Sequence, residues 1–257
     1  MPTFKTDHAE IYYESYGSGP LLIFAHGGGG NTFSWWQQAP YFAKSHRVIL
    51  FDQRGFGRSQ CEEGYLHPKY FPRDLLALYH AAGIDKATLV CQSLGGLTGL
   101  PFTIAHPERV KALILCGTTG GLRIPKELRG GSLSREEMKK RGPGRTVFAE
   151  DFPERKPELA LLFSMITQLN DMTSMETLRP GMAETRVSLE SLGGYNTPTL
   201  IIHGTNDALF RPEAMRAIAD MIPGAVSVEI PAVGHSTYFE DAEAFNKAVD
   251  GFINDHE

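Results

Sequence analysis

The chain has 257 residues, of which 42% are hydrophobic, and this is enough for one large domain with a buried core. Its formal net charge of −5 at pH 7 argues against an electrostatic nucleic-acid partner. Three cysteines, an odd number, do not make a disulfide framework and fit a reducing compartment.

The first eight residues lack the apolar core of a signal peptide, and no stretch of the sequence approaches the length of a transmembrane helix. We therefore expect a cytoplasmic protein without a membrane span. The histidines show no spacing typical of a metal site, so the sequence predicts neither a metal nor a cofactor. The oligomeric state stays open.

Short apolar runs alternate with helix-like segments along the chain. Strands are expected at residues 12–16 (an edge strand), 21–25, 47–51, 87–91, 111–116, 199–203 and 226–230. Helices are expected at residues 34–44, 69–82, 94–106, 212–221 and 241–254. Because most of the strand runs are continuously apolar, the pattern predicts an α/β fold, with a mostly parallel central sheet covered by helices on both faces.

This alternation is interrupted between residues 119 and 196, where no strand is expected. Residues 158–166 in this stretch have a broad apolar helical face. We expect a core formed by residues 1–118 and 197–257, with a helical cap at 119–196 over the carboxyl ends of the strands, where ligands bind in open α/β sheets. Phe163 and Met165 of the cap, together with Trp35, are the candidate residues of the substrate pocket.

The clearest chemical signal surrounds Ser93. The apolar run 87–91 leads almost directly into this serine, and a helix-compatible segment follows from Leu94. A serine between strand and helix sits on a tight turn that exposes its hydroxyl, and the residues two positions before and after it must be small. Here they are Cys91 and Gly95, whereas the general pattern is G-x-S-x-G. Ser93 is the predicted nucleophile.

Two further polar residues each follow a predicted strand. His235 comes after the last strand, and its imidazole could take the serine proton and return it to the leaving group near neutral pH. Asp207 follows the preceding strand, and its carboxylate could hold the imidazole tautomer. No acidic residue closely follows Cys116, which removes the main alternative position for the acid.

A glycine run, residues 27–30, follows the strand at 21–25 and lies at the same expected sheet edge. The backbone N–H of Gly28, with that of Leu94, would form an oxyanion hole. The run is not a phosphate-binding loop, since no Lys-Ser/Thr pair follows it. The preceding His26 is expected to brace the loop.

Taken together, these motifs resemble the α/β-hydrolase family, in its small esterase and haloperoxidase-like branch. The matching stretches are residues 26–30, 52–59, 92–96, 107–110, 204–207 and 234–235. The chain order Ser93, Asp207, His235 is the family's order. The resemblance implies the α/β-hydrolase fold and the triad, but it says little about the substrate. The chain departs from the family pattern at Cys91, and at Gly99 and Pro101 within the following helix, where proline should cause a kink.

The leading interpretation is a cofactor-free serine hydrolase that cleaves a small or medium carboxylic ester through an acyl-enzyme. Its partner would be a small-molecule ester. Two alternatives remain on this scaffold: a C–C bond hydrolase of a dienone-type substrate, and a small-ligand receptor with a slow triad. A cofactor-free lyase or dioxygenase is a further possibility. Epoxide hydrolases and haloalkane dehalogenases are disfavoured because they need an aspartate where Ser93 stands.

Overall fold

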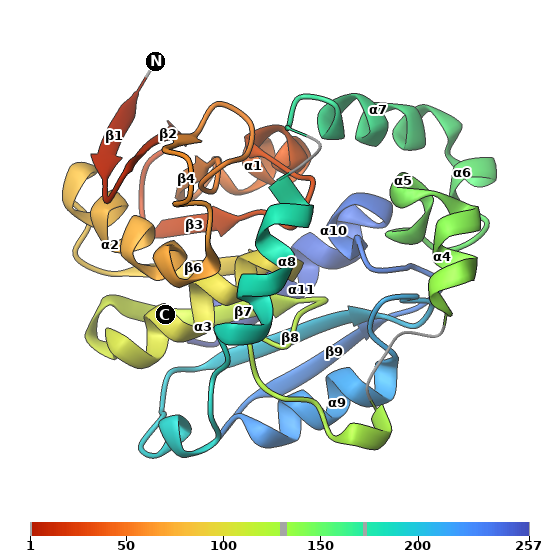
Figure 1. Ribbon diagram of the computed structural model, residues 1–257. Helices are drawn as coiled ribbons and strands as arrows, with labels where there is room; N and C mark the ends of the chain where they lie inside the picture. The colour runs from red at the N-terminus through yellow and green to blue at the C-terminus, as the bar shows by residue number, and fades with distance from the viewer. Residues whose placement is uncertain (1, 129–132, 172–173, 257) are drawn as a thin grey trace.

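The computed structural model describes residues 2–128, 133–171 and 174–256 (Figure 1). Within these ranges the backbone forms a nine-stranded sheet in the order β1-β2-β4-β3-β6-β7-β8-β9, with β5 paired to β2. The strands are β1 (Thr3–Thr6), β2 (Ala9–Tyr16), β3 (Leu21–Ala25), β4 (Arg47–Phe51), β5 (Gln60–Cys61), β6 (Ala87–Gln92), β7 (Val110–Cys116), β8 (Thr199–Gly204) and β9 (Val226–Ile230).

The strands from β3 onward pair in parallel, apart from the short β5, while β2 joins β1, β4 and β5 in antiparallel fashion. The prediction of a mostly parallel sheet is therefore confirmed. The sequence pattern did not reveal β1 and β5, which are only four and two residues long and lie at the antiparallel edge.

Helices cover both faces of the sheet. They are α1 (Gln38–Phe42), α2 (Phe71–Ala81), α3 (Gly96–Ala105), α9 (Pro212–Met221), α10 (Thr237–Glu240) and α11 (Ala242–Asn254). Alternate strand residues face opposite ways. Thus Phe24 packs in a cluster with residues of α1 and α11, whereas its neighbour Ile23 packs in a second cluster with residues of α2, α3 and α9.

The helix expected at residues 34–44 is broken, and this prediction was wrong. The chain instead forms a 3₁₀ turn, η1 (Thr32–Trp35), followed by the short α1. Pro40 explains the break, because inside a continuous helix its ring would collide with the carbonyl of Trp36. In the observed structure Pro40 lies in the first turn of α1, where a proline is tolerated.

Between β7 and β8 the described residues form a second group of helices, called here the insertion helices. They are α4 (Arg135–Arg141), α5 (Pro143–Thr146), α6 (Phe152–Arg155), α7 (Pro157–Thr167) and α8 (Ser174–Glu184). In Figure 1, α4, α5 and α6 lie at the right of the view, α7 lies above α1 and α10, and α8 is drawn in front of the sheet. Phe148, Phe152, Phe163 and Ile166 of this stretch join the same buried cluster as Phe24.

Candidate active site

Ser93 sits on a strained turn between strand and helix. β6 ends at Gln92, the 3₁₀ turn η3 (Ser93–Gly95) follows, and α3 begins at Gly96. The φ angle of Ser93 is +48°, in the left-handed region that non-glycine residues seldom adopt. Such a conformation costs on the order of 1–3 kcal/mol and persists only where the surrounding structure imposes it. The turn leaves Ser93 partly exposed between a buried strand and a buried helix.

Close backbone contacts explain why the neighbours of Ser93 are small. A side chain at Gly95 would collide with the carbonyl group of Ala25 on β3. On the other side of the serine, Cys91 is fully buried at the end of β6. Its Sγ occupies the space that a side chain at Gly99 on α3 would need. The cysteine is therefore accommodated because Gly99 has no side chain, and burial raises the pKa of its thiol, as the shielded position predicts.

Asp207 and His235 lie side by side at the ends of β8 and β9. Oδ2 of Asp207 is 2.9 Å from Nδ1 of His235, and both side chains are buried. The other carboxylate oxygen, Oδ1, accepts the backbone N–H groups of Leu209 at 2.8 Å and Phe210 at 2.9 Å. Since a carboxylate only accepts, Nδ1 of His235 carries the proton. Nε2 is thus the basic atom, and it is buried with no hydrogen-bond partner among the described residues.

One cavity of about 1010 Å³ brings the predicted site residues together. Ser93, Leu94, Gly28 and His235 all line it, so the sheet gathers segments that are far apart in the sequence. The remaining lining combines apolar side chains with a charged rim. The insertion helices contribute Lys139, Thr146, Phe163, Met175, Glu176, Arg179 and Met182, and other segments add Gly27, Gly30, Gln92, Val147, Leu209, Ser236 and Tyr238.

Of the three residues predicted for the substrate pocket, Phe163 lines this cavity, whereas Trp35 and Met165 do not. Trp35 is completely buried in the core, where its ring packs against Phe24 and Tyr238. Met165 is 57% exposed and lines a separate apolar groove on the opposite side of α7 from Phe163. The apolar face of α7 is broad enough to reach both surfaces, and the sequence alone gave no basis for deciding which residue faces the cavity.

Hydrogen bonds fix the peptide that carries the Gly28 N–H. The carbonyl of Gly27 accepts from Nδ1 of His26 at 2.8 Å and from the N–H of Gly30 at 3.0 Å. The tautomer of His26 follows from its other nitrogen, since Nε2 accepts the backbone N–H of Gln53 at 2.9 Å. Burial lowers the pKa of His26, which favours this neutral form. Because a peptide is planar, holding the Gly27 carbonyl also fixes the direction of the Gly28 N–H.

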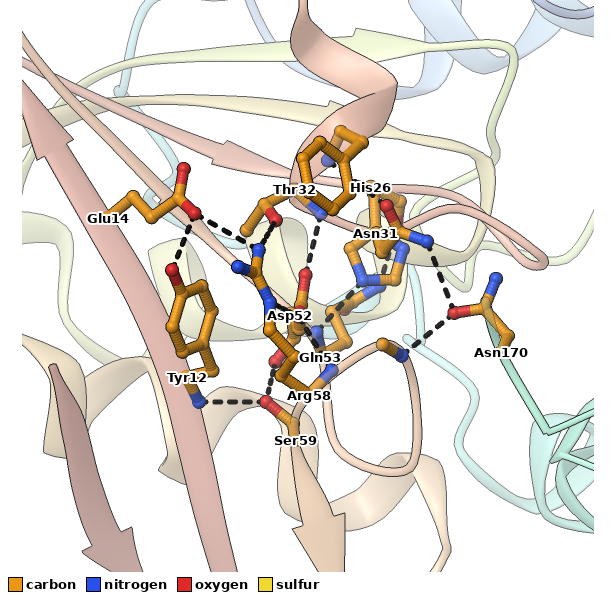
Figure 2. A network of polar contacts seen from close by, with 12 residues as sticks. Tyr12, Glu14, His26, Asn31, Thr32, Asp52, Gln53, Arg58, Ser59 and Asn170 are labelled. Atoms are coloured by element: carbon orange, nitrogen blue, oxygen red, sulfur yellow. Dashed lines mark hydrogen bonds and ion pairs between the residues drawn. The ribbon is translucent and has the colours of Figure 1, made fainter. Parts of the chain in front are cut away.

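The motif at residues 52–59 stabilises the loops next to the site through a network of polar contacts (Figure 2). The buried carboxylate of Asp52 accepts the backbone N–H groups of Thr32 at 2.6 Å and Arg58 at 2.8 Å. The guanidinium of Arg58 also pairs with Glu14 at 3.0 Å and stacks over the ring of Tyr12. These residues do not line the cavity, so their role is to hold the loops that do.

Several residues near the site were not identified from the sequence. Met175 and Met182 of α8 and Tyr238 of α10 line the cavity. Glu240 accepts the N–H of Gly234, next to His235, at 2.8 Å. Asn170, just after α7, contacts the glycine loop. No local pattern marks such residues, because their partners are distant in the sequence.

The described residues form neither a membrane-spanning helix nor a metal cluster. No helix there is both long enough and apolar enough to cross a membrane. In the same residues, no group of three or more His, Cys, Asp or Glu side chains is placed to hold a metal ion.

Comparison with known proteins places this geometry in a family. The family model described as the alpha/beta hydrolase fold matches residues 20–242. A 2-hydroxy-6-oxo-6-(2'-aminophenyl)hexa-2,4-dienoic acid hydrolase of Metapseudomonas resinovorans is 29% identical over 95% of this chain and 88% of the relative.

Solved structures of similar proteins agree. The enol-lactonase from Burkholderia xenovorans LB400 superposes with a TM-score of 0.82 at 26% identity, over 98% of this chain and 100% of that one. A thermophilic esterase from Thermogutta terrifontis gives a TM-score of 0.80 at 27% identity, over 97% and 95% of the two chains. The family model covers most of the chain, and the structural matches extend over nearly all of it, so this protein belongs to the α/β-hydrolase family.

Proposed function

We propose that the protein is a serine hydrolase that cleaves a small or medium carboxylic ester through an acyl-enzyme. One observation carries the proposal. His235, with Nδ1 held by Asp207 and Nε2 without a hydrogen-bond partner among the described residues, lines the same cavity as the strained Ser93. An oriented imidazole whose basic nitrogen is not already engaged, in the same cavity as a serine on a strand-to-helix turn, can serve as the base that nucleophilic acyl transfer requires.

In the proposed reaction, Oγ of Ser93 attacks the ester carbonyl while Nε2 of His235 accepts its proton. The negative charge that develops on the carbonyl oxygen is stabilised by the N–H groups of Gly28 and Leu94. His235 then protonates the leaving alcohol as the C–O bond breaks. A water molecule then attacks the acyl-enzyme while His235 takes its proton; the bond from the acyl carbon to Oγ breaks, His235 returns the proton to Oγ, and the carboxylic acid leaves. The reaction needs no cofactor.

We further propose that residues 119–196 act as the cap of this site. The insertion helices supply Phe163, Met175 and Met182 to the cavity wall, while the reacting groups come from the loops after the strands. This division supports a cap that selects substrates and a core that performs the chemistry. The apolar wall favours an acyl or alcohol group with hydrocarbon character.

C–C bond hydrolysis of a dienone-type substrate is the second candidate. It is favoured by the 29% identity to the 2-hydroxy-6-oxo-6-(2'-aminophenyl)hexa-2,4-dienoic acid hydrolase, which extends over nearly the whole chain. The same serine, histidine and oxyanion hole would serve both reactions, so these residues do not discriminate between them. A ligand receptor with a slow triad would instead show turnover that stops near one product per protein.

The proposal is tested by labelling and turnover. A fluorophosphonate probe should add one covalent adduct to the wild-type protein, mapped by mass spectrometry to Ser93, and Ser93→Ala should abolish it. Turnover is then measured on p-nitrophenyl esters of graded acyl length, with a 2-hydroxy-6-oxo-dienoate as the C–C substrate. Labelling that persists in Ser93→Ala, or maps to another residue, would overturn the nucleophile assignment.

A further inference from the structure

Asn170 connects the insertion helices to the glycine loop of the site. It lies three residues beyond the end of α7 and is buried. Its Nδ2 donates to the carbonyl of Gly29 at 2.7 Å and to that of Thr167 at 3.2 Å. Its Oδ1 accepts the N–H of Gly57 at 2.8 Å, with a longer contact of 3.5 Å from Nδ2 of Asn31 (Figure 2).

These partners fix the orientation of the amide. The Gly57 N–H can only donate, and the Gly29 and Thr167 carbonyls can only accept. Rotating the Asn170 amide by half a turn would place its NH₂ group against an N–H and its oxygen against two carbonyls. The donor to Gly29 is therefore a specific feature of this side chain.

A short chain of planar peptides leads from Asn170 to the predicted oxyanion donor. The Gly29 carbonyl that Asn170 holds belongs to the peptide that also contains the Gly30 N–H. This N–H donates to the Gly27 carbonyl at 3.0 Å, and that carbonyl shares a peptide with the Gly28 N–H. Each peptide is planar, so fixing one polar group fixes the other. The loop consists of glycines, with Gly29 at a φ of +78°, and its backbone has much freedom to lose.

We propose that Asn170 is a positioning residue that holds the oxyanion hole from the insertion helices. This inference rests on the proposed function, because it assumes that the Gly28 N–H binds the oxyanion. His26 holds the Gly27 carbonyl from the core side, and Asn170 holds the Gly29–Gly30 peptide from the insertion side. Without Asn170, the Gly29–Gly30 peptide can rotate, and the Gly28 N–H loses its fixed aim at the developing charge.

Two substitutions distinguish the hydrogen bond that Asn170 donates to Gly29 from the other contacts of its side chain. Asn170→Ala removes every contact of the amide. Asn170→Asp keeps an acceptor for the Gly57 N–H but replaces the donor to Gly29 with a carboxylate oxygen. Gln168→Ala is the matched control, because Gln168 lies two residues away, is exposed, and bonds within its own helix through Ser164.

The measurements are kcat and KM on a p-nitrophenyl ester, the melting temperature, and the inhibition constant of a phenyl trifluoromethyl ketone. Ser93 adds to this ketone and places a negative oxygen in the oxyanion hole, so its inhibition constant reports on that hole directly. Removing an oxyanion donor outright typically costs about 10²–10³ in kcat. Loss of positioning should cost less, about tenfold in kcat for both Asn170 variants, with KM changed by less than about twofold.

The inhibition constant should rise about in proportion to the fall in kcat/KM, and Gln168→Ala should match the wild type in every measurement. Wild-type inhibition constants in both Asn170 variants would overturn the proposal, whether or not the melting temperature falls. Fluorophosphonate labelling of the wild type at Ser93 separates the two hypotheses. If Ser93 is not labelled, the proposed function fails; if it is labelled while the Asn170 variants behave as wild type, only the positioning role fails.

Discussion

Cys91 and Gly99 show how a departure from a family pattern is accommodated by a single neighbour. The serine turn needs a small residue two positions before the nucleophile, and Cys91 adds a sulfur atom there. That sulfur lies where a side chain of Gly99 would be, one turn into α3. The sequence identified both departures, but only the packing shows that they are one feature.

Because Cys91 and Gly99 share this space, we expect substitutions at the two positions to have strongly coupled effects on the free energy of unfolding. Gly99→Ala should destabilise the wild type, because overpacking against Sγ costs about 1–3 kcal/mol, partly offset by the roughly 1 kcal/mol that alanine gains over glycine in a helix. In the Cys91→Gly background the sulfur is gone, and Gly99→Ala should be neutral or stabilising. Urea unfolding of the four proteins measures the coupling. Additive effects of the two substitutions would show that they do not share this space.

Replacing Asp207 with asparagine tests the proposed chemistry more sharply than removing the side chain would. In Asp207→Asn, the backbone N–H groups of Leu209 and Phe210 require an acceptor at Oδ1, so the NH₂ group must face His235. Nδ1 of the imidazole must then accept, and its proton moves to Nε2. The base can no longer take the serine proton, and kcat should fall about 10²–10⁴-fold with an unchanged fold.

Ester turnover and circular dichroism together check this outcome. Asp220→Asn is the control, since Asp220 is exposed on α9 and does not line the cavity. Near-wild-type turnover in Asp207→Asn would mean that another group orients His235.

The three polar residues proposed for catalysis could be predicted because local patterns mark them. Each follows a predicted strand, and the carboxyl ends of parallel strands meet at one sheet edge. Asn170 could not be predicted in this way. Its contact with Gly29 spans 141 positions, and nothing in its own neighbourhood distinguishes it from an ordinary residue at the end of a helix.

At the scale of elements, the two sides of α7 contribute to two different surfaces, the cavity and a separate groove. Phe163 points into the cavity and packs against Phe148 and Phe239, whereas Met165 is exposed on the other side. A helix with apolar residues on most of its circumference carries no periodic signal for which side is the core. The existence of this helix was predictable, but its orientation depends on contacts with segments on both sides of it in the sequence.

Phe163 and Met165 provide a matched pair of substitutions that tests whether the cavity wall selects the substrate. Phe163→Leu should enlarge the cavity beside the reacting groups and raise the ratio of kcat/KM for long over short acyl esters, by roughly threefold to tenfold. Met165→Ala should leave this ratio unchanged, since Met165 is not among the described residues lining the cavity. The ratio, measured on a p-nitrophenyl ester series, is insensitive to the fraction of folded enzyme. An equal loss for every ester in Phe163→Leu would make the residue a packing residue only.

At the scale of the whole molecule, several polar contacts join the insertion to the core near the site, and two of them are made by buried or largely buried side chains. One is Asn170 on the glycine loop. The other is Glu240 at the end of α10, whose Oε1 accepts the Gly234 N–H at 2.8 Å and whose Oε2 accepts the Ala149 N–H at 3.1 Å. Ala149 belongs to the segment between α5 and α6, so one carboxyl group joins the insertion to the loop that carries His235. Most of the sheet and of its helices could be predicted from hydrophobic periodicity, but hydrogen bonds between distant segments could not.

Glu240 makes the stability of the whole molecule depend on pH. Burial raises its pKa from the ordinary 4.5 to about 8, although the two N–H groups and Arg155 favour the ionised form, and the charge of Asp207 adds to the increase. Between pH 4.5 and 8 the folded protein therefore holds a proton that the unfolded chain has released. The free energy of unfolding must fall as the pH rises through this range, by at most about 1.4 kcal/mol per pH unit from this group.

Glu240→Gln removes this titration while keeping the size of the side chain. Its NH₂ group faces one of the two N–H donors, which costs stability, but by an amount that does not depend on pH. The wild type should therefore be clearly more stable than Glu240→Gln at pH 5, and its advantage should shrink steadily toward pH 8. Urea unfolding at half-unit pH steps measures this, with Glu243→Gln as the control, because Glu243 is exposed on the adjoining α11. Parallel stability curves for the wild type and Glu240→Gln would show that this carboxyl group titrates alike in the folded and unfolded chain.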